Sequence, residues 1–92
     1  MNIVQTNLFF KTVKKLNVNQ KADLDVAVKL VMNKPKIGKA KAGDLSNVYV
    51  YKFNMSKQLT LLAYIFQDET ETLTLLALGS RENFYRDLKR SI

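Results

Sequence analysis

The residues best suited to chemistry lie near the end of the chain, where an apolar run stops at Gly79 and Ser80 follows. Serine is a frequent helix cap, so the pattern predicts a strand that ends at Gly79 and a helix that begins at about Arg81. Arg81 and Tyr85 are then one helical turn apart, beside the end of the strand. A guanidinium in this place can hold a phosphate through two hydrogen bonds, so we expect the functional site at this junction.

The composition limits which chemistry is open to the chain. It has 92 residues, 47% of them hydrophobic, which predicts one domain over 1–92 with a single modest core and a shallow site. There is no Cys, which excludes disulfides and thiolate nucleophiles, and no His, the commonest general base and metal ligand. We therefore expect no metal and no cofactor.

The charge favours an anionic partner. The formal charge of +7 comes from 15 Lys and Arg against 8 Asp and Glu, which favours RNA, DNA or an acidic polypeptide, with a merely soluble basic surface as the alternative. The segment 34–43 has no acid, the single Pro, two of the three Gly and four lysines, Lys34, Lys36, Lys39 and Lys41. It is predicted to be a basic loop that either binds an anion or is a solvated linker. Its glycine spacing does not fit a P-loop, which excludes nucleotide binding by that motif.

No segment of the sequence resembles a membrane span. The uninterrupted apolar stretches are too short, and the N-terminus lacks a basic region followed by an apolar core. We expect a cytoplasmic protein without membrane contact.

Two helices are predicted in the first part of the chain, after a short edge strand at 2–5. Thr6 or Asn7 can cap the first helix, and Asn17 with Gln20 three residues later forms a capping box for the second. Pro35 ends that second helix near 32–33. Its apolar stripe is expected to contain Ala22, Leu24, Ala27, Val28 and Val31.

The second part of the chain has the period of strands. Alternation from 47 to 53, an apolar run at 59–66 and a third run at 72–78 predict three antiparallel strands, followed by a helix at about 81–90. The order predicts an α+β domain of two layers, a helical hairpin packed on an antiparallel sheet with a C-terminal helix. Tyr49, Tyr51 and Phe53 fall on one face of the first strand and are expected to be core residues rather than a base-stacking platform.

This order of elements resembles the RelE/ParE superfamily of bacterial type II toxins. The similarity covers essentially the whole chain and is closest to the ParE-like/HigB-like branch. It includes Gly43-Asp44-Leu45 before the first of the three strands and Leu62-Ala63-Tyr64 in the second. Its most specific part is Leu76-Ala77-Leu78-Gly79-Ser80-Arg81-Glu82-Asn83-Phe84-Tyr85-Arg86-Asp87-Leu88-Lys89.

The resemblance implies a toxin whose relatives of the RelE type cut mRNA in the ribosomal decoding site. Carried onto this chain, it implies catalytic roles for Lys52, Arg81 and Tyr85, with Phe84 as the alternative to Tyr85. The positive charge of the chain further predicts RNA or ribosome contacts for a wider basic set, Lys34, Lys36, Lys39, Lys41, Arg86 and Arg90. Two departures thin this set. Val50 and Leu61 stand where RelE proper has Lys and Arg, and Arg81 stands where close ParE-like relatives often have His.

RNA cleavage by its own 2′-hydroxyl needs alignment and positive charge near the phosphate, which side chains can supply without a metal. Arg81 would be a phosphate fork, Lys52 a charge or a base, and Tyr85 would position a nucleotide. Each has a plainer interpretation: an exposed strand lysine, a surface arginine of a first helical turn, and an aromatic side chain packed on the sheet.

Two classes of function therefore compete. The first is a metal-independent, ribosome-dependent endoribonuclease that inhibits translation. The second is a ParE-type inhibitor that binds DNA gyrase without chemistry, and a third option is an inactive relative that only binds its antitoxin. In each case we expect a cognate antitoxin, acidic or amphipathic, as protein partner.

Overall fold

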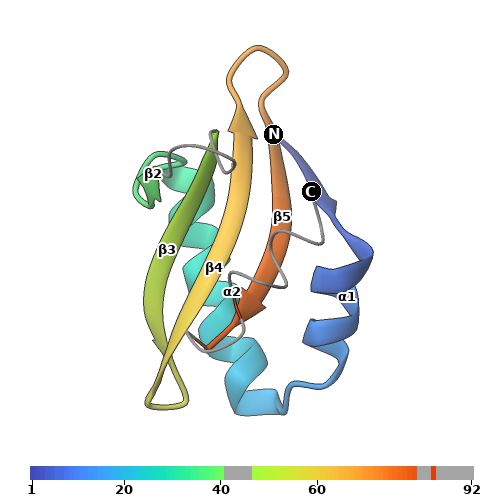
Figure 1. Ribbon diagram of the computed structural model, residues 1–92, viewed down its shortest axis with the longest axis vertical. Helices are drawn as coiled ribbons and strands as arrows, with labels where there is room; N and C mark the ends of the chain where they lie inside the picture. Colours follow the sequence, from blue (N-terminus) through green and yellow to red (C-terminus); the bar gives the residue numbers. More distant parts are fainter. Residues whose placement is uncertain (41–46, 81–83, 85–92) are drawn as a thin grey trace.

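The computed structural model describes residues 1–40, 47–80 and 84, and it has two helices packed on a five-stranded sheet (Figure 1). The elements in chain order are β1 (Asn2–Gln5), α1 (Asn7–Lys14), α2 (Val18–Asn33), β2 (Lys39–Ala40), β3 (Val48–Met55), β4 (Gln58–Gln67) and β5 (Thr72–Gly79). In space the strand order is β1-β5-β4-β3-β2. The predicted α+β class is confirmed. The predicted C-terminal helix lies outside the described residues except for Phe84, which is helical and buried.

Both helices begin at the caps that the sequence predicts. The Thr6 hydroxyl accepts a hydrogen bond from the Phe9 N–H at 3.1 Å and donates one to the carbonyl of Leu76 in β5 at 2.7 Å. Asn17 and Gln20 form the reciprocal capping box, at 2.8 and 2.9 Å. The first of these caps therefore also fixes α1 to the sheet.

The buried stripe of α2 differs from the prediction at one position. Leu24, Ala27 and Val31 are buried against the sheet, at spacings of three and four residues. Ala22, which was expected in the same stripe, is exposed. Two residues turn a helix by about 200°, so Ala22 and Leu24 lie on opposite sides of α2.

The sheet is mixed, and the parallel pair involves β1. Strands β3, β4 and β5 form the predicted antiparallel meander. Strand β1 is an edge strand as expected, but it runs parallel to β5, with Ile3 opposite Leu73 and Gln5 opposite Leu75. The two-residue strand β2, on the other edge beside β3, was not predicted because it lies inside the basic loop.

Two apolar clusters lie on the two faces of the sheet. On the face covered by α1 and α2, called here the helix face, the buried set is Phe9, Leu24, Val31, Met55, Leu62, Tyr64, Leu73, Leu75 and Leu78. On the other side, called here the opposite face, it is Val48, Val50, Leu61, Ala63, Leu76, Ala77 and Phe84. Alternation along each strand produces this division.

A β-bulge in β5 changes which residues face the helices. The pairing with β4 shifts between Ala63, which is opposite Ala77, and Tyr64, which is opposite Leu75. Leu76 is therefore the extra residue, and it joins Ala77 on the opposite face while Leu75 and Leu78 stay on the helix face. The Thr6 hydroxyl donates to the carbonyl of this bulged residue, which ties the start of α1 to the irregular part of β5.

Candidate functional site

Lys52 lies in a row of residues that leads across the sheet to the end of β5. Lys52 of β3 is opposite Leu61 of β4, and Leu61 is in turn opposite Gly79 of β5. The Lys52 side chain is exposed and shares the opposite face with the alternate β3 residues Val48 and Val50. With about 4.8 Å between neighbouring strands, Lys52 is roughly 10 Å from Gly79. The structure thus brings Lys52 near the strand end that precedes Ser80 and Arg81.

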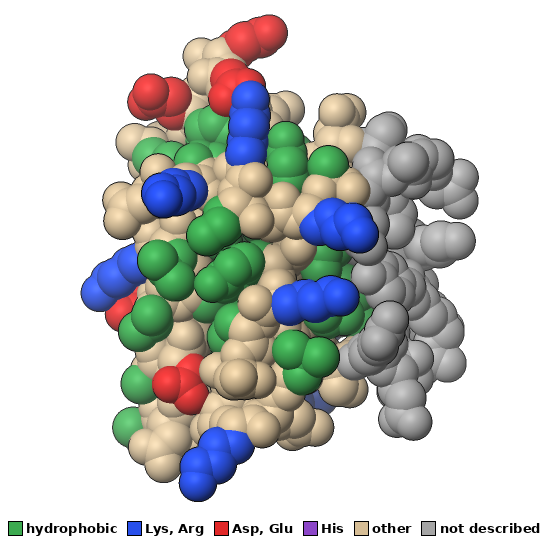
Figure 2. Space-filling view, turned by 90° about the vertical axis from the view of Figure 1, so that its left-hand side faces the viewer, with side chains coloured by type: hydrophobic (Ala, Val, Ile, Leu, Met, Phe, Trp, Pro, Cys, Tyr) green, Lys and Arg blue, Asp and Glu red, His purple; other side chains and the backbone are tan. Residues whose placement is uncertain are grey.

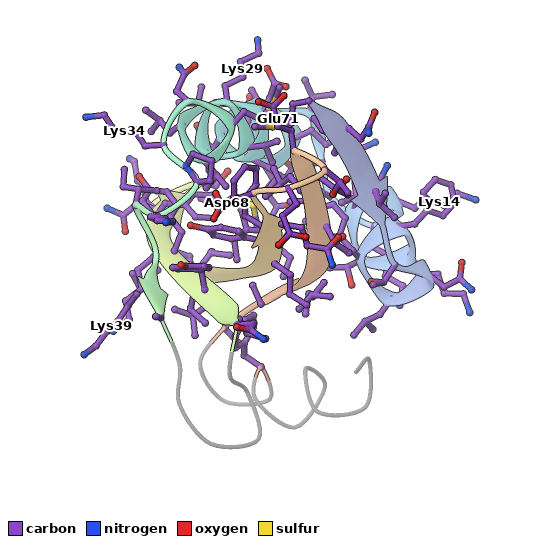
Figure 3. The ribbon with its side chains drawn as sticks, turned by 90° about the horizontal axis from the view of Figure 1, so that it is seen from above. Lys14, Lys29, Lys34, Lys39, Asp68 and Glu71 are labelled. Atoms are coloured by element: carbon purple, nitrogen blue, oxygen red, sulfur yellow. The ribbon has the colours of Figure 1, made fainter. Side chains whose placement is uncertain are left out.

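Lys39 is a second cation on the same face. In β2 it is directly opposite Val50 of β3, and directly opposite residues in a sheet point to the same side. Lys39 and Lys52 are therefore diagonal neighbours on adjacent strands, with their Cα atoms about 7 to 8 Å apart. Figure 3 shows Lys39 at the sheet edge, on the side away from α2. We call these two residues the lysine pair.

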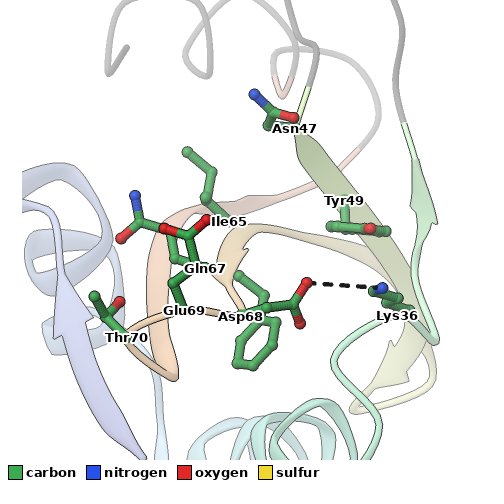
Figure 4. A pocket seen from close by; sticks show the side chains of 9 residues that line it. Lys36, Asn47, Tyr49, Ile65, Gln67, Asp68, Glu69 and Thr70 are labelled. Atoms are coloured by element: carbon green, nitrogen blue, oxygen red, sulfur yellow. Dashed lines mark ion pairs between the residues drawn. The ribbon is translucent and has the colours of Figure 1, made fainter.

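The other described lysines of the basic loop point elsewhere. Lys34 is the C-cap of α2 and lies beside that helix in Figure 3. The Lys36 ammonium is 3.8 Å from a carboxylate oxygen of Asp68 in the β4–β5 turn (Figure 4). Lys41 lies outside the described residues. An anion on the opposite face would therefore meet Lys39 but neither Lys34 nor Lys36, and the RNA contacts of these residues stay a prediction.

Tyr64, which lies on the helix face of β4, connects the basic loop to the sheet. Its hydroxyl donates to the carbonyl of Pro35 at 2.7 Å and accepts from the N–H of Gly38 at 2.9 Å. Burial raises the pKa of Tyr64 above its ordinary value of 10.0, so the hydroxyl keeps its proton at neutral pH. The loop that carries Lys36 and leads into Lys39 is thus fixed at two points.

The aromatic residues of β3 lie where the sequence predicted them. Tyr49, Tyr51 and Phe53 are half-buried and pack against the core of the helix face. Tyr49 stacks on Tyr64, with ring centroids 5.6 Å apart, and Tyr51 stacks on Phe53 at 6.1 Å. They are core residues as predicted.

The remaining predicted site residues, Arg81, Tyr85, Arg86 and Arg90, lie outside the described residues. Their convergence with Lys52 on one surface stays a prediction. Phe84, which the family pattern left as an alternative to Tyr85, is 2% exposed and belongs to the core of the opposite face. That burial leaves Phe84 unable to stack on a nucleotide.

The sequence matches the family model of the ParE-like toxin of type II bacterial toxin–antitoxin systems over residues 3–89. The chain belongs to this family. No curated protein matches it.

Solved structures of RelE proteins share the fold of this toxin. The toxin in the intact E. coli RelBE toxin–antitoxin complex is 20% identical with a TM-score of 0.71, over 88% of this chain and 96% of that one. A doubly substituted E. coli RelE in the free state is 19% identical with a TM-score of 0.74, over 98% and 90%. The Mycobacterium tuberculosis RelBE2 toxin–antitoxin complex contains a chain that is 19% identical with a TM-score of 0.66, over 87% of this chain and 96% of that one. At these identities the likeness shows the RelE-like fold.

The opposite face of this toxin carries apolar residues at two places where the resemblance to RelE implies cations. Val50 is 3% exposed and Leu61 is 1% exposed, and both belong to the core beside Lys52. Among the described residues, the cations of this part of the face are therefore limited to the lysine pair. Figure 2 shows the edge formed by β2 and β3, with basic side chains spread along it and acidic ones both at the end that holds the β4–β5 turn and at the lower left of the view.

A cleft at that end of the toxin was not predicted from the sequence. It lies between the basic loop and the β4–β5 turn, and its polar lining includes Lys36, Asn47, Gln67, Asp68 and Glu69 (Figure 4). These residues come from segments far apart in the chain, so no local pattern could reveal it.

Over residues 1–40, 47–80 and 84, no group of three acidic side chains is placed to hold a metal ion, and neither helix is long and apolar enough to cross a membrane.

Proposed function

We propose that this toxin is a ribosome-dependent mRNA endonuclease that inhibits translation. The observation that carries the proposal is the common placement of Lys39, Lys52 and Gly79. The lysine pair shares one face of the sheet, and the row through Lys52 ends at the residue that precedes Ser80 and Arg81. A phosphate beside the end of β5 would have the Lys52 ammonium nearby, and Arg81 follows this strand end by two residues in the sequence.

The proposed reaction needs no metal. The 2′-hydroxyl of a nucleotide gives up its proton and its oxygen attacks the adjacent phosphorus. The bond to the 5′-oxygen of the next nucleotide breaks and that oxygen takes up a proton, so the products are a cyclic phosphate and a free 5′-hydroxyl. Negative charge grows on the phosphate oxygens as the new bond forms, so Lys52 and Arg81 would stabilise the transition state more than the ground state. Tyr85 would hold the nucleotide by stacking or hydrogen bonding. Lys39 would attract the neighbouring phosphate.

A cognate antitoxin and a cytoplasmic location belong to the same proposal. Two structural relatives, E. coli RelBE and M. tuberculosis RelBE2, are toxin–antitoxin complexes. With a formal charge of +7, this toxin is complementary to an acidic antitoxin. Its substrate, mRNA on translating ribosomes, places it in the cytoplasm.

Two observations favour the alternative of a gyrase inhibitor without catalytic activity. The buried Val50 and Leu61 leave fewer cations around Lys52 than the resemblance to RelE implies, and the family model is that of ParE-like toxins. A face with fewer cations has less positive charge with which to stabilise an anionic transition state. An inactive relative that only binds its antitoxin would share this surface.

The test is primer-extension mapping of mRNA on translating ribosomes, combined with a supercoiling assay with DNA gyrase. We expect cleavage by the wild type, and Arg81→Ala or Lys52→Ala should each lose roughly 2 to 4 kcal/mol of transition-state stabilisation. Lys29→Ala on α2 is the matched control, since Lys29 is paired with Asp25 at 3.0 Å, away from the opposite face. Equal cleavage by Lys52→Ala would remove that residue from the mechanism. Inhibition of supercoiling without mRNA cleavage would favour the gyrase inhibitor.

A further inference from the structure

The hydroxyl of Tyr64 is a polar group placed inside the core. Tyr64 is 0% exposed and lies in the middle of β4, on the helix face. Both of its hydrogen-bond partners, the Pro35 carbonyl and the Gly38 N–H, belong to the segment between α2 and β2. A buried hydroxyl without partners is costly, so this group favours one path of the segment over others.

Gly38 fits the same contact from the other side. A Cβ at this position would lie 2.7 Å from the Tyr64 hydroxyl oxygen and 3.1 Å from the backbone carbon and oxygen of Val50. The segment can approach β3 and β4 this closely only because residue 38 has no side chain. Glycine at 38 and tyrosine at 64 therefore form one contact.

This contact directly precedes Lys39. Strand β2 has only two residues, Lys39 and Ala40, which pair with Val50 and Tyr49. So short a strand has little hydrogen bonding of its own to fix its register. A shift by one residue would turn Lys39 to the helix face, because side chains alternate along a strand.

We propose that Tyr64 is a positioning residue for Lys39. Its hydroxyl holds Pro35 and Gly38, Gly38 sets the register of β2 against β3, and this register places the Lys39 ammonium on the opposite face beside Lys52. The inference rests on the proposed function, in which Lys39 attracts an RNA phosphate. In this way Tyr64, on the helix face, determines whether the Lys39 ammonium lies on the opposite face.

The test is a double-mutant cycle of Tyr64→Phe and Lys39→Gln in the full chain. Tyr64→Phe removes one oxygen and keeps the ring that stacks on Tyr49. Binding to bacterial ribosomes and to a single-stranded RNA oligonucleotide is measured across a salt titration. We expect each single variant to bind several-fold more weakly than wild type, and the double variant to bind no more weakly than Lys39→Gln alone. Equal weakening by Tyr64→Phe in both backgrounds would show a general structural effect and overturn the proposal.

Two further variants sharpen the result. Gly38→Ala breaks the same contact from the loop side, so it should reproduce the effect of Tyr64→Phe and likewise lose it in the Lys39→Gln background. Tyr51→Phe is the matched control, a half-buried tyrosine of β3 on the same face of the sheet, and it should bind as wild type does. Near-ultraviolet circular dichroism and thermal unfolding identify the fraction of each variant that is folded.

Amide hydrogen exchange at Gly38 separates a failure of this inference from a failure of the proposed function. We expect faster Gly38 exchange in Tyr64→Phe than in wild type. If Lys39→Gln binds RNA like the wild type, Lys39 makes no phosphate contact. The proposed role of Tyr64 in positioning Lys39 is then also overturned, whatever rate of Gly38 exchange is measured. If Lys39→Gln weakens binding but Gly38 exchange is unchanged in Tyr64→Phe, the proposed function stands and the role of Tyr64 is overturned.

Discussion

The two faces of the sheet are built from the same strands but differ in the size and charge of their side chains. The helix face has large side chains that α1 and α2 cover, and Leu62, Tyr64 and Leu73 are each 0% exposed there. The core of the opposite face is built mostly of smaller residues, such as Val50, Ala63 and Ala77, and the lysine pair lies along its β2–β3 edge. Because side chains alternate, a strand can contribute stability on one face and ligand contacts on the other. In so small a domain, this division lets one five-stranded sheet carry both the helix-covered core and the face on which we propose that RNA binds.

The sharpest test of this division is a truncation in each face of β4. Leu62→Ala should lower the free energy of unfolding by roughly 2 to 5 kcal/mol, because it leaves a cavity under the helices. Leu59→Ala should change it by no more than about 0.5 kcal/mol, because Leu59 is 50% exposed. Urea unfolding followed by circular dichroism measures both. Similar losses for the two variants would contradict the division.

The cap of α1 is a smaller part of the stability of the helix face. Thr6→Val removes the oxygen that caps α1 and binds the Leu76 carbonyl, and it should cost about 1 to 2 kcal/mol in unfolding free energy. Thr12→Val is the matched control, since the Thr12 hydroxyl donates only to the Leu8 carbonyl one turn earlier in the same helix. The same urea titration compares them. A larger loss for Thr12→Val would show that the cap does not fix the helix to the bulge.

The opposite face is tested by its charge. Replacing Lys39 and Lys52 together by Gln should change the unfolding free energy by less than about 0.5 kcal/mol, because both side chains are exposed. The slope of log affinity for single-stranded RNA against log salt should become shallower by about 0.7 for each phosphate that the variant no longer neutralises. Lys29→Gln, on α2, should leave the slope as in wild type. An unchanged slope in the double variant would show that the lysine pair is solvated and neutralises no RNA phosphate.

The smallest effect is expected at high pH. The folded state holds the Tyr64 proton more tightly than the unfolded chain does, because burial raises its pKa and the nearby Tyr49 and Tyr51 add to this. The unfolded chain therefore binds fewer protons than the folded one above pH 10, and the contribution of Tyr64 to the free energy of unfolding should be constant below that pH and fall above it. Tyr64→Phe should remove this part of the alkaline loss. Equal alkaline profiles of the two proteins would show that Tyr64 does not cause it.

Local patterns predicted the parts of the fold that depend on neighbours in sequence. The caps at Thr6 and Asn17, the end of α2 before Pro35, and the three strands of the meander all follow from residues within a few positions of one another. The parallel pairing of β1 with β5 could not be predicted in this way, because the paired segments are far apart in the chain. Two residues are also too few to show a strand period, so β2 was hidden in the basic loop.

The same limit applies to the candidate site. The family pattern assigned Lys52, but its pairing with Lys39 on one face follows from the β2–β3 register alone. The sequence shows four lysines close together, whereas the fold directs the described ones to different sides of the molecule. The hydroxyl of Tyr64 meets partners 26 and 29 residues away. Nothing in the apolar run around Tyr64 indicates that its oxygen has this use.

The parallel pairing of β1 with β5 gives the folding of this toxin an order in time. Strand β1 and helix α1 are made first, yet their main partner is β5, and the hydrogen bond from Thr6 to Leu76 spans 70 residues. During most of synthesis the first segment has no sheet on which to pack, and such distant contacts slow folding after release. A nascent chain that stops before β5 therefore lacks a completed sheet. The toxin acquires its complete sheet only after β5 has left the ribosome, the particle on which we propose that it acts.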